Sequence, residues 1–379
     1  MEKKTSQEIR SKVTKEGYME ISIIESPIPK PQENEVLVRM EAAPINPSDL
    51  GKLLSHAADL SDIETSGDRQ NTKTKIKLKT KLIAPLQPRL NQLIPLGNEG
   101  SGVIVDAGPG AKGMIGKTVG LAGGGMYSQY RCMPANNCLL MDEQTTPEEA
   151  ASSFVNPMTA LYFIETMKLE GHKALIHTAA SSNLGQMLIK ICKADAIPLI
   201  NIVRDSSQIK SLKNIGADFV CSTSEASFDD DLTVCIKETG ATLAFDATGG
   251  GNEGKLAGQI LSAMEKAILS SIEEFQIYGS DIHKQVYIYG GLDRSPTILN
   301  RSYGMSWSVG GWLLTPMINK FGMETFQRMR KRVAAEIKTT FASNYYRSIS
   351  FEEVLQPDII RSYATQTTGK KYLIAPHKE

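Results

Sequence analysis

The sequence predicts an α/β protein in which a β-rich domain is interrupted by a doubly wound parallel-sheet domain. Residues 18–50 alternate short β-like runs with proline-rich turns, as antiparallel sheets do. From about residue 147, helical patterns alternate with short apolar runs, which is typical of right-handed βαβ units and a parallel sheet. Residues 350–375 return to helix and strand, and we expect them to fold back on the first half.

Length and composition limit the classes of protein to consider. A chain of 379 residues suggests two domains, which we place at 1–155 with 345–379 and at 156–344. The 42 basic and 42 acidic residues cancel, which argues against nucleic acid and for a small-molecule partner. No apolar run is long enough for a membrane span, so we expect no membrane association and a cytoplasmic protein. The 5 cysteines are widely spaced without a Cys-x-x-Cys pair, which argues against a disulfide framework and a structural zinc.

The β-rich half contains one segment that looks inserted, residues 55–91. Within it, lysines alternate with other residues over 73–81, and this period of two fits an exposed strand with one cationic face. Such a face could bind an anionic substrate tail, for example a coenzyme A phosphate. The commoner explanation, which we favour, is a solvated edge strand that its lysines protect from aggregation.

The second half contains the predicted parallel strands. They cover residues 174–177, 199–203, 219–220, 243–246 and 286–289. A second inserted segment, 257–284, holds a predicted helix over 256–272 whose purpose the sequence does not indicate.

The turn after the first of these strands is the most informative segment. Small residues lead from the strand into a helix with one apolar face, which is the first βα step of a dinucleotide-binding fold. There a pyrophosphate would meet free N–H groups and the positive end of the helix dipole. Of the usual glycines only Gly185 is present, with Ala180 and Ser182 at the other positions, so an ordinary small-residue turn remains an alternative.

Arg204 follows the second predicted strand, at the position where dinucleotide-binding folds bind the adenosine ribose. An NAD-specific fold places a carboxylate at the strand end, whereas a guanidinium offers a bidentate fork to a 2′-phosphate. The sequence therefore favours NADPH as cofactor. The alternative is a surface arginine paired with Asp205.

Taken together, short motifs along the chain resemble the medium-chain dehydrogenase/reductases, in particular the quinone oxidoreductases and the 2-enoyl thioester reductases. The motifs occupy residues 45–49, 97–103, 125–130, 156–160, 182–186, 202–205, 215–218, 247–250, 289–291, 311–313 and 368–370. The resemblance implies a GroES-like domain interrupted by a Rossmann domain. It also implies a homodimer formed through residues 303–314.

The resemblance carries a set of cofactor-binding residues over to this chain. They are Asn156, Thr159, Ser182, Asn183, Leu184, Gly185, Arg204, Thr248, Gly249, Tyr289, Gly290, Gly291, Trp312 and Lys370. Several of them, Trp312 above all, would pack equally well without a cofactor.

The same resemblance implies a reaction without metal. Asn46 and Ser48 stand where zinc-dependent relatives need ligands, so we expect no metal site and prefer reduction of a quinone or activated enone to alcohol oxidation. Related enzymes have a tyrosine just after the Asn-Pro-x-Asp motif, and this chain has none. Asn46, as a ligand of a substrate oxygen, and Tyr127, as a replacement proton donor, are the catalytic candidates. Lys52 or His56 could also replace the tyrosine, or water could protonate the product.

Two other functions remain open at this stage. A 2-enoyl thioester reductase is favoured by the motifs at 97–100 and 202–205 and disfavoured by the missing tyrosine. A non-catalytic NADPH-binding redox sensor is possible because fold and cofactor do not establish chemistry.

Overall fold

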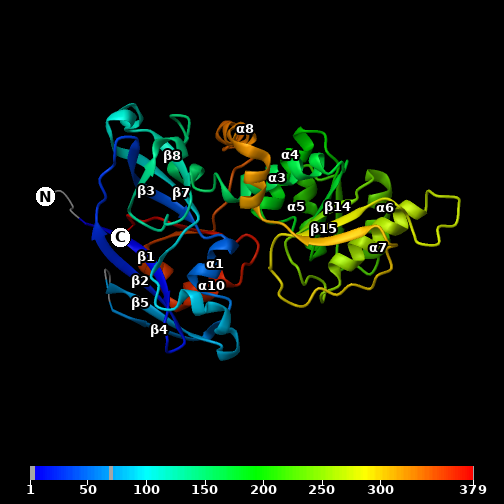
Figure 1. The fold of residues 1–379 in the computed structure, drawn as a ribbon, viewed down its shortest axis with the longest axis horizontal. Coiled ribbons are helices and arrows are strands. Elements are labelled where there is room, and N and C mark those ends of the chain that lie inside the picture. The colour runs from blue at the N-terminus through cyan, green and yellow to red at the C-terminus, as the bar shows by residue number, and fades with distance from the viewer. Residues whose placement is uncertain (1–4, 68–70, 379) are drawn as a thin grey trace. The chain divides into compact units, whose positions relative to one another are not determined.

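The computed structural model describes residues 5–67 and 71–378, and they form two compact units (Figure 1). One unit runs to Val155 and resumes at Arg330, and the other runs from Asn156 to Met329. The chain rejoins the first unit earlier than residue 345 because the end of helix α8 (Leu314–Ala335) already belongs to it. The predicted α/β fold, a β-rich unit interrupted by a parallel-sheet unit, is confirmed.

The first unit is built on two mainly antiparallel sheets in the described part of the chain. One has the order β4-β5-β2-β1-β6, with β1 (Thr5–Val13), β2 (Tyr18–Pro27), β4 (Ala58–Ser66), β5 (Lys73–Leu78) and β6 (Ile94–Pro95). The other has the order β10-β8-β7-β3-β18-β17, with β9 also paired to β3. Its strands are β3 (Glu35–Pro44), β7 (Glu99–Ala107), β8 (Thr118–Ala122), β9 (Tyr130–Pro134), β10 (Leu139–Leu140), β17 (Arg347–Ile349) and β18 (Tyr372–Ile374).

The C-terminal segment completes this unit, as the sequence suggested. Strand β18 pairs antiparallel with β3, where Leu373 lies opposite Pro44. Short helices connect the strands: η1 (Pro47–Asp49), α1 (Leu50–Leu53), α2 (Pro147–Ala150), α9 (Phe351–Val354) and α10 (Pro357–Ala364).

The lysine-rich strand β5 differs from its prediction. The alternation is as expected, since Ile76 is buried and the flanking Lys75 and Lys77 are exposed. However, β5 pairs with β2 on one side and β4 on the other, so the prediction of a solvated edge strand was wrong. Neighbouring strands supply carboxylates to this face, and Lys73 lies 2.9 Å from Glu20. The lysines therefore indicated a solvent-exposed face of the strand and not a strand at the edge of its sheet.

The second unit contains a parallel sheet with the order β13-β12-β11-β14-β15-β16. The strands are β11 (Leu175–His177), β12 (Leu199–Val203), β13 (Phe219–Ser222), β14 (Leu243–Asp246), β15 (Lys284–Ile288) and β16 (Trp307–Gly311). This is the strand order of dinucleotide-binding Rossmann sheets, in which the direction of winding reverses between β11 and β14. Ligands bind in such sheets outside the carboxyl ends of the strands at that reversal.

The helices of the second unit follow from apolar spacing. They are α3 (Val155–Leu169), α4 (Asn183–Ala194), α5 (Ile209–Asn214), α6 (Phe228–Thr239) and α7 (Leu256–Leu269). Helices α6 and α7 pack on one face of the sheet through Leu232, Ile236 and Ile260, while α3 and α4 lie on its other side in Figure 1. The predicted helix over 256–272 is thus α7, which covers the sheet.

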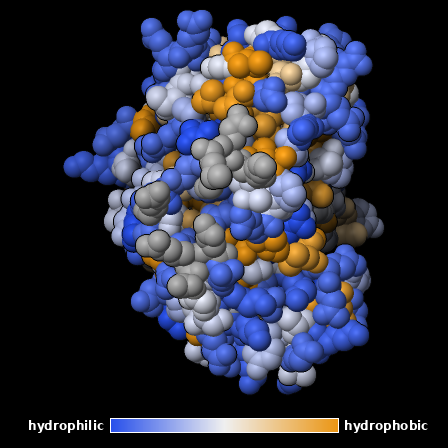
Figure 2. Space-filling view, turned by 90° about the vertical axis from the view of Figure 1, so that its left-hand side faces the viewer, coloured by the Kyte–Doolittle hydropathy of each residue, from blue (hydrophilic) through white to orange (hydrophobic). Residues whose placement is uncertain are grey.

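The side shown in Figure 2 is mostly hydrophilic, with small hydrophobic patches. Within the described residues, no helix combines the length and apolar character that crossing a membrane requires.

Candidate functional site

The carboxyl edge of the parallel sheet collects most of the predicted cofactor residues. Ser182 follows β11, Arg204 follows β12, Thr248 follows β14, Tyr289 follows β15 and Trp312 follows β16. Because all the strands run in the same direction, these five positions lie along one edge of the sheet. The reversal between β11 and β14 lies in the middle of this edge.

The turn between β11 and α4 has the geometry of a phosphate-binding turn. The Ser182 hydroxyl caps α4 by accepting a hydrogen bond from the Gly185 N–H at 3.1 Å. A Cβ on Gly185 would lie 2.2 Å from the Ala180 carbonyl oxygen, so only glycine permits this close approach of helix and turn. The buried hydroxyl of Ser181 has no hydrogen-bond partner. A turn with an unpartnered hydroxyl at a helix N-terminus fits a pyrophosphate.

The Gly185 contact leads to a stability prediction. Gly185→Ala should lower the free energy of unfolding by about 1–3 kcal/mol, because the new methyl group must displace backbone. Gly291→Ala is the matched control, since nothing lies within 4 Å of a Cβ there. Chemical denaturation of both variants measures the difference, and equal stabilities would show that the turn can relax.

A buried carboxylate that the sequence analysis missed holds the turn after β14. Asp246 is fully buried and accepts hydrogen bonds from the Thr178 hydroxyl at 2.7 Å and from the N–H groups of Thr248 and Gly249 at 2.8 and 3.0 Å. It thereby joins the ends of β11 and β14 on either side of the reversal. The Thr248 hydroxyl also donates to Asp246, so it is used within the protein. Asp246 could have been recognised in the sequence because it directly precedes the motif at residues 247–250.

The aromatic residues of the edge form a packed cluster. The Tyr289 hydroxyl lies 2.8 Å from Nε2 of His177, whose pKa burial lowers to about 3, so the imidazole is neutral. The Trp312 indole donates to the Thr166 hydroxyl at 3.2 Å and packs edge-on against Phe163. Tyr289 and Trp312 therefore have structural partners at the edge of the sheet whether or not a cofactor binds.

Arg204 has no structural partner of this kind. Its side chain is exposed and forms no ion pair with any residue of 5–67 or 71–378. The Asp205 carboxylate instead accepts the Ser207 N–H at 2.8 Å, and hydrogen bonds from Ser207 lower the pKa of Asp205. The charge of Arg204 also contributes to lowering the pKa of Asp205, but no ion pair joins the two side chains.

Further predicted cofactor residues lie in α3, after β15 and in the first unit. Asn156 and Thr159 lie in α3, where Thr159 is buried. Gly290 closely approaches the backbone of Ala247, where a Cβ would lie 2.4 Å from the carbonyl oxygen. Lys370 is exposed in the first unit, with its ammonium 6.0 Å from the centre of the Tyr346 ring. The cofactor roles of these residues stay predictions.

In the first unit, Asn46 belongs to a buried polar cluster. Its Nδ2 donates to Glu99 at 2.8 Å, and Glu99 also accepts the N–H groups of Phe154 and Val155. The Asn46 Oδ1 is buried and has no partner. The Glu99 contact orients the amide so that its unpaired atom is an acceptor. This acceptor suits a ligand N–H or O–H, such as a substrate hydroxyl, whereas a substrate carbonyl oxygen would need a donor.

Asp49 and Lys371 are ionisable residues of this cluster that the sequence analysis did not select. The Asp49 carboxylate accepts the N–H groups of Asn46 and Asn98, both at 2.9 Å, and burial raises its pKa to about 7. Lys371 donates to Ser152 at 2.7 Å, and burial lowers its pKa. Both lie within or beside motifs noted above, at residues 45–49 and 368–370.

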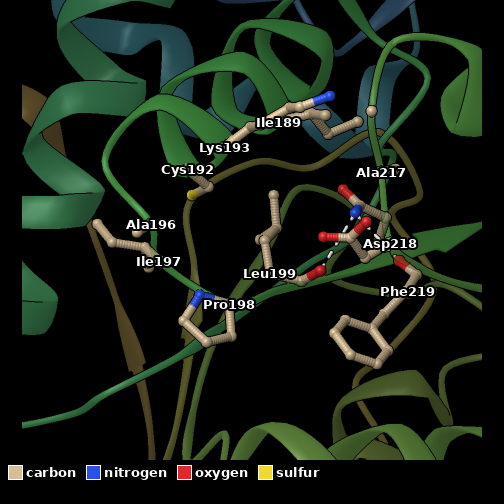
Figure 3. Close-up of a pocket in the computed structure, with 12 residues that line it drawn as sticks. Ile189, Cys192, Lys193, Ala196, Ile197, Pro198, Leu199, Ala217, Asp218 and Phe219 are labelled. Carbon is tan, nitrogen blue, oxygen red and sulfur yellow. Dashed lines mark hydrogen bonds between the residues drawn. The ribbon is translucent and has the colours of Figure 1, made fainter.

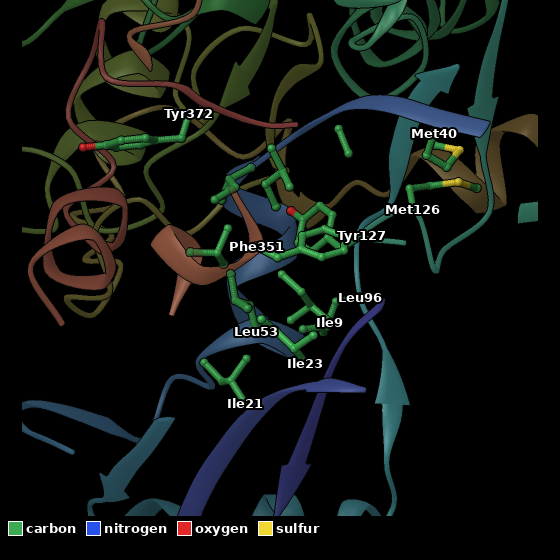
Figure 4. Packing of buried hydrophobic residues seen from close by; sticks show 14 of the residues in the cluster. Ile9, Ile21, Ile23, Met40, Leu53, Leu96, Met126, Tyr127, Phe351 and Tyr372 are labelled. Atoms are coloured by element: carbon green, nitrogen blue, oxygen red, sulfur yellow. The ribbon is translucent and has the colours of Figure 1, made fainter. Parts of the chain in front are cut away.

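Tyr127, the other catalytic candidate, lies in the hydrophobic core. Only 1% of it is exposed, and it packs among residues such as Ile9, Leu96 and Phe351 (Figure 4). Its hydroxyl donates to the Pro44 carbonyl oxygen at 3.1 Å, and burial raises its pKa well above the ordinary value. These contacts place Tyr127 in the core, where its hydroxyl also interacts with Asp49, and its role as proton donor stays a prediction.

A cavity of about 290 Å³ lies away from these groups (Figure 3). It is found where α4 ends and β12 and β13 begin, so it lies at the amino edge of the sheet. Lys193, Asn201 and Asp218 are among its lining residues. The predicted cofactor residues lie at the carboxyl edge, so this cavity is not part of the candidate site. Among the described residues, no group of three or more His, Cys, Asp or Glu side chains could hold a metal ion.

Comparisons with known proteins agree with this architecture. Residues 32–143 match the alcohol dehydrogenase GroES-like domain. Mitochondrial enoyl-[acyl-carrier-protein] reductases are similar to parts of the chain: 26% identity over 255 residues for one from Caenorhabditis elegans and 30% over 204 residues for one from Xenopus tropicalis. These matches span 65% and 51% of this chain, and 64% and 49% of the relatives' own lengths.

Solved structures match the chain over almost its whole length. A protein assigned as an NADPH:quinone reductase from Mesorhizobium loti has a TM-score of 0.69 at 22% identity, covering 99% of this chain and 100% of that one. The complex of Etr1p with NADP and crotonyl-CoA has a TM-score of 0.66 at 17% identity, covering 98% and 99%. The family match covers residues 32–143, and the solved structures share the fold of the whole chain, in which a β-rich unit is interrupted by a parallel-sheet unit.

Proposed function

We propose that this protein is an NADPH-dependent reductase that transfers hydride to a quinone or activated enone without a metal. The observation that carries the proposal is the turn after β11, where Ser182 caps α4, Gly185 lies against Ala180 and the Ser181 hydroxyl has no partner. Such a turn can hold a pyrophosphate. Arg204 supports NADPH over NADH because its exposed guanidinium has no ion-pair partner in the described chain.

The residues of this chain would bind and orient the reactants. Ser181, Ser182 and the N-terminus of α4 would hold the pyrophosphate, and Arg204 would hold the 2′-phosphate. When bound, NADPH supplies the hydride. Asn46 would accept a hydrogen bond through Oδ1 from an N–H or O–H group of a reactant, because Glu99 holds the amide in that orientation. Since Tyr127 is in the core, we infer that the reduced product takes its proton from water.

An enoyl thioester reductase is the second candidate. It is favoured by the similarity to mitochondrial enoyl-[acyl-carrier-protein] reductases and by the fold shared with the Etr1p complex. It is disfavoured because no tyrosine stands among the residues directly after Asp49 and because Tyr127 is buried.

A substrate panel distinguishes these functions. We expect the protein to oxidise NADPH with small quinones or enones, faster than with enoyl-CoA esters, and without loss of rate after treatment with a chelator. Faster turnover of enoyl thioesters would establish the second candidate. Binding of NADPH without turnover of any substrate would favour the redox sensor, and loss of activity on chelation would contradict the metal-independent reaction.

We also propose a homodimer in the cytoplasm. Strand β16 lies at one end of the sheet order, so one of its edges is available for pairing with a second copy. Light scattering at micromolar concentration should give twice the mass of the chain, which is 41.4 kDa. A monomer at that concentration would contradict the proposed dimer, and recovery with a mitochondrial matrix marker would contradict the proposed location.

A further inference from the structure

Two of the five cysteines lie against each other in the second unit. The Cys221 thiol, in β13, donates to the sulfur of Cys235, in α6, with 3.7 Å between the sulfurs. Cys221 is buried and Cys235 is partly exposed. We propose that Cys221 and Cys235 form a reversible disulfide when the protein meets a hydroperoxide, and that this oxidation weakens NADPH binding. The second part rests on the proposed function.

The contact gives the two thiols different chemical roles. The hydrogen bond from Cys221 lowers the pKa of Cys235 and raises that of Cys221. Cys235 is therefore the sulfur that ionises more readily, and it is also the one that solvent reaches. Thiolate character and exposure are the two properties that select a cysteine for oxidation.

The reaction is a two-electron oxidation in two steps. The Cys235 thiolate attacks one peroxide oxygen, the O–O bond breaks, and the other oxygen takes up a proton and leaves as an alcohol or water. The resulting sulfenic acid is attacked by the Cys221 sulfur. The S–S bond forms, the S–O bond breaks, and the hydroxide leaves as water with the thiol proton of Cys221. The sulfurs lose two electrons and the peroxide gains two, and an added dithiol reverses the change.

The pair is connected to the proposed NADPH site through the end of β13. Two residues after Cys221, the Thr223 N–H donates to the Val203 carbonyl at 3.0 Å, and its hydroxyl donates to the Arg204 carbonyl at 3.4 Å. Disulfide formation must shorten the sulfur distance to about 2.05 Å. It therefore draws the end of β13 toward α6 and away from its present register beside Arg204.

The covalent part is tested on the reduced full-length protein with hydrogen peroxide. Peptide mapping by mass spectrometry should find Cys221 joined to Cys235, with a mass loss of about 2 Da that dithiothreitol restores. Cys235→Ser and Cys221→Ala should prevent the link. Cys132→Ser is the matched control, because Cys132 is also partly exposed but belongs to the other unit. Absence of the link, or oxidation of Cys235 to sulfinic acid alone, would overturn the proposal.

The functional part is tested by NADPH titration of the reduced and the oxidised protein. We expect oxidation to weaken NADPH binding by roughly 5-fold or more in the wild type and the Cys132→Ser variant. Treatment with the peroxide should have no such effect on Cys235→Ser or Cys221→Ala. Two variants are used so that the test still works if one of them fails to fold. Equal affinities with the link present would overturn the connection to Arg204. If the reduced protein does not bind NADPH, the proposed function fails, while the mapping still decides whether the disulfide forms.

Discussion

Replacing Arg204 with alanine is expected to weaken NADPH binding by roughly 10- to 150-fold, which corresponds to about 1.5–3 kcal/mol. The reason is the loss of a charge-assisted contact with the 2′-phosphate from a side chain that forms no ion pair in the described structure. NADH lacks this phosphate, so its affinity should change little. Titration of the variant with both cofactors measures the two effects separately.

Two further measurements test this interpretation. Arg204→Lys keeps the charge but loses the planar fork, so it should recover part of the NADPH affinity. High salt should reduce the preference of the wild type for NADPH, because the side chain is exposed. If Arg204→Ala weakened NADH as much as NADPH, the side chain would support the local fold, and the assignment of NADPH would lose its residue-level support.

Asp49 is expected to make the stability of the protein fall as the pH rises from 5 to 8. Its pKa is about 7 in the folded protein against the ordinary 3.8, so the folded state binds the proton more tightly than the unfolded state. The contribution to stability is complete below pH 3.8 and is lost as the pH passes 7. Between pH 5 and 8 this loss amounts to about 2–3 kcal/mol.

The variant Asp49→Asn isolates this contribution, because its amide stays neutral throughout. Its free energy of unfolding, relative to wild type, should rise between pH 5 and 8 by the amount that the wild type loses. Asp62→Asn, which changes an exposed carboxylate, should follow the wild type. If the free energy of unfolding changed with pH in the same way for Asp49→Asn and wild type, Asp49 would ionise in the folded protein as readily as in the unfolded chain.

Local sequence patterns were sufficient for the elements and their type. Apolar runs bounded by small residues identified the parallel strands from β11 to β15, and the turn at Ser182 was found because a helix N-terminus next to a strand needs small residues. The strand β5 shows the limit of such patterns. Its alternation gave the correct exposed face, but an edge strand and an interior strand with one solvated face have the same period, so only pairing decides between them.

The candidate site, like the fold, could be predicted from the sequence only in part. The sequence by itself determined the position of Gly185 and Arg204, because each depends on its place directly after a strand or within the first turn of a helix. Only the tertiary structure decided which polar atoms are already paired. Asn46 has its donor held by Glu99, Tyr127 donates to Pro44, and Asp246 is held by N–H groups of its own turn and by Thr178. Apart from the N–H groups of the turn after Asp246, these hydrogen-bond partners lie far apart in the sequence. Which of them meet in the interior depends on which strands are neighbours.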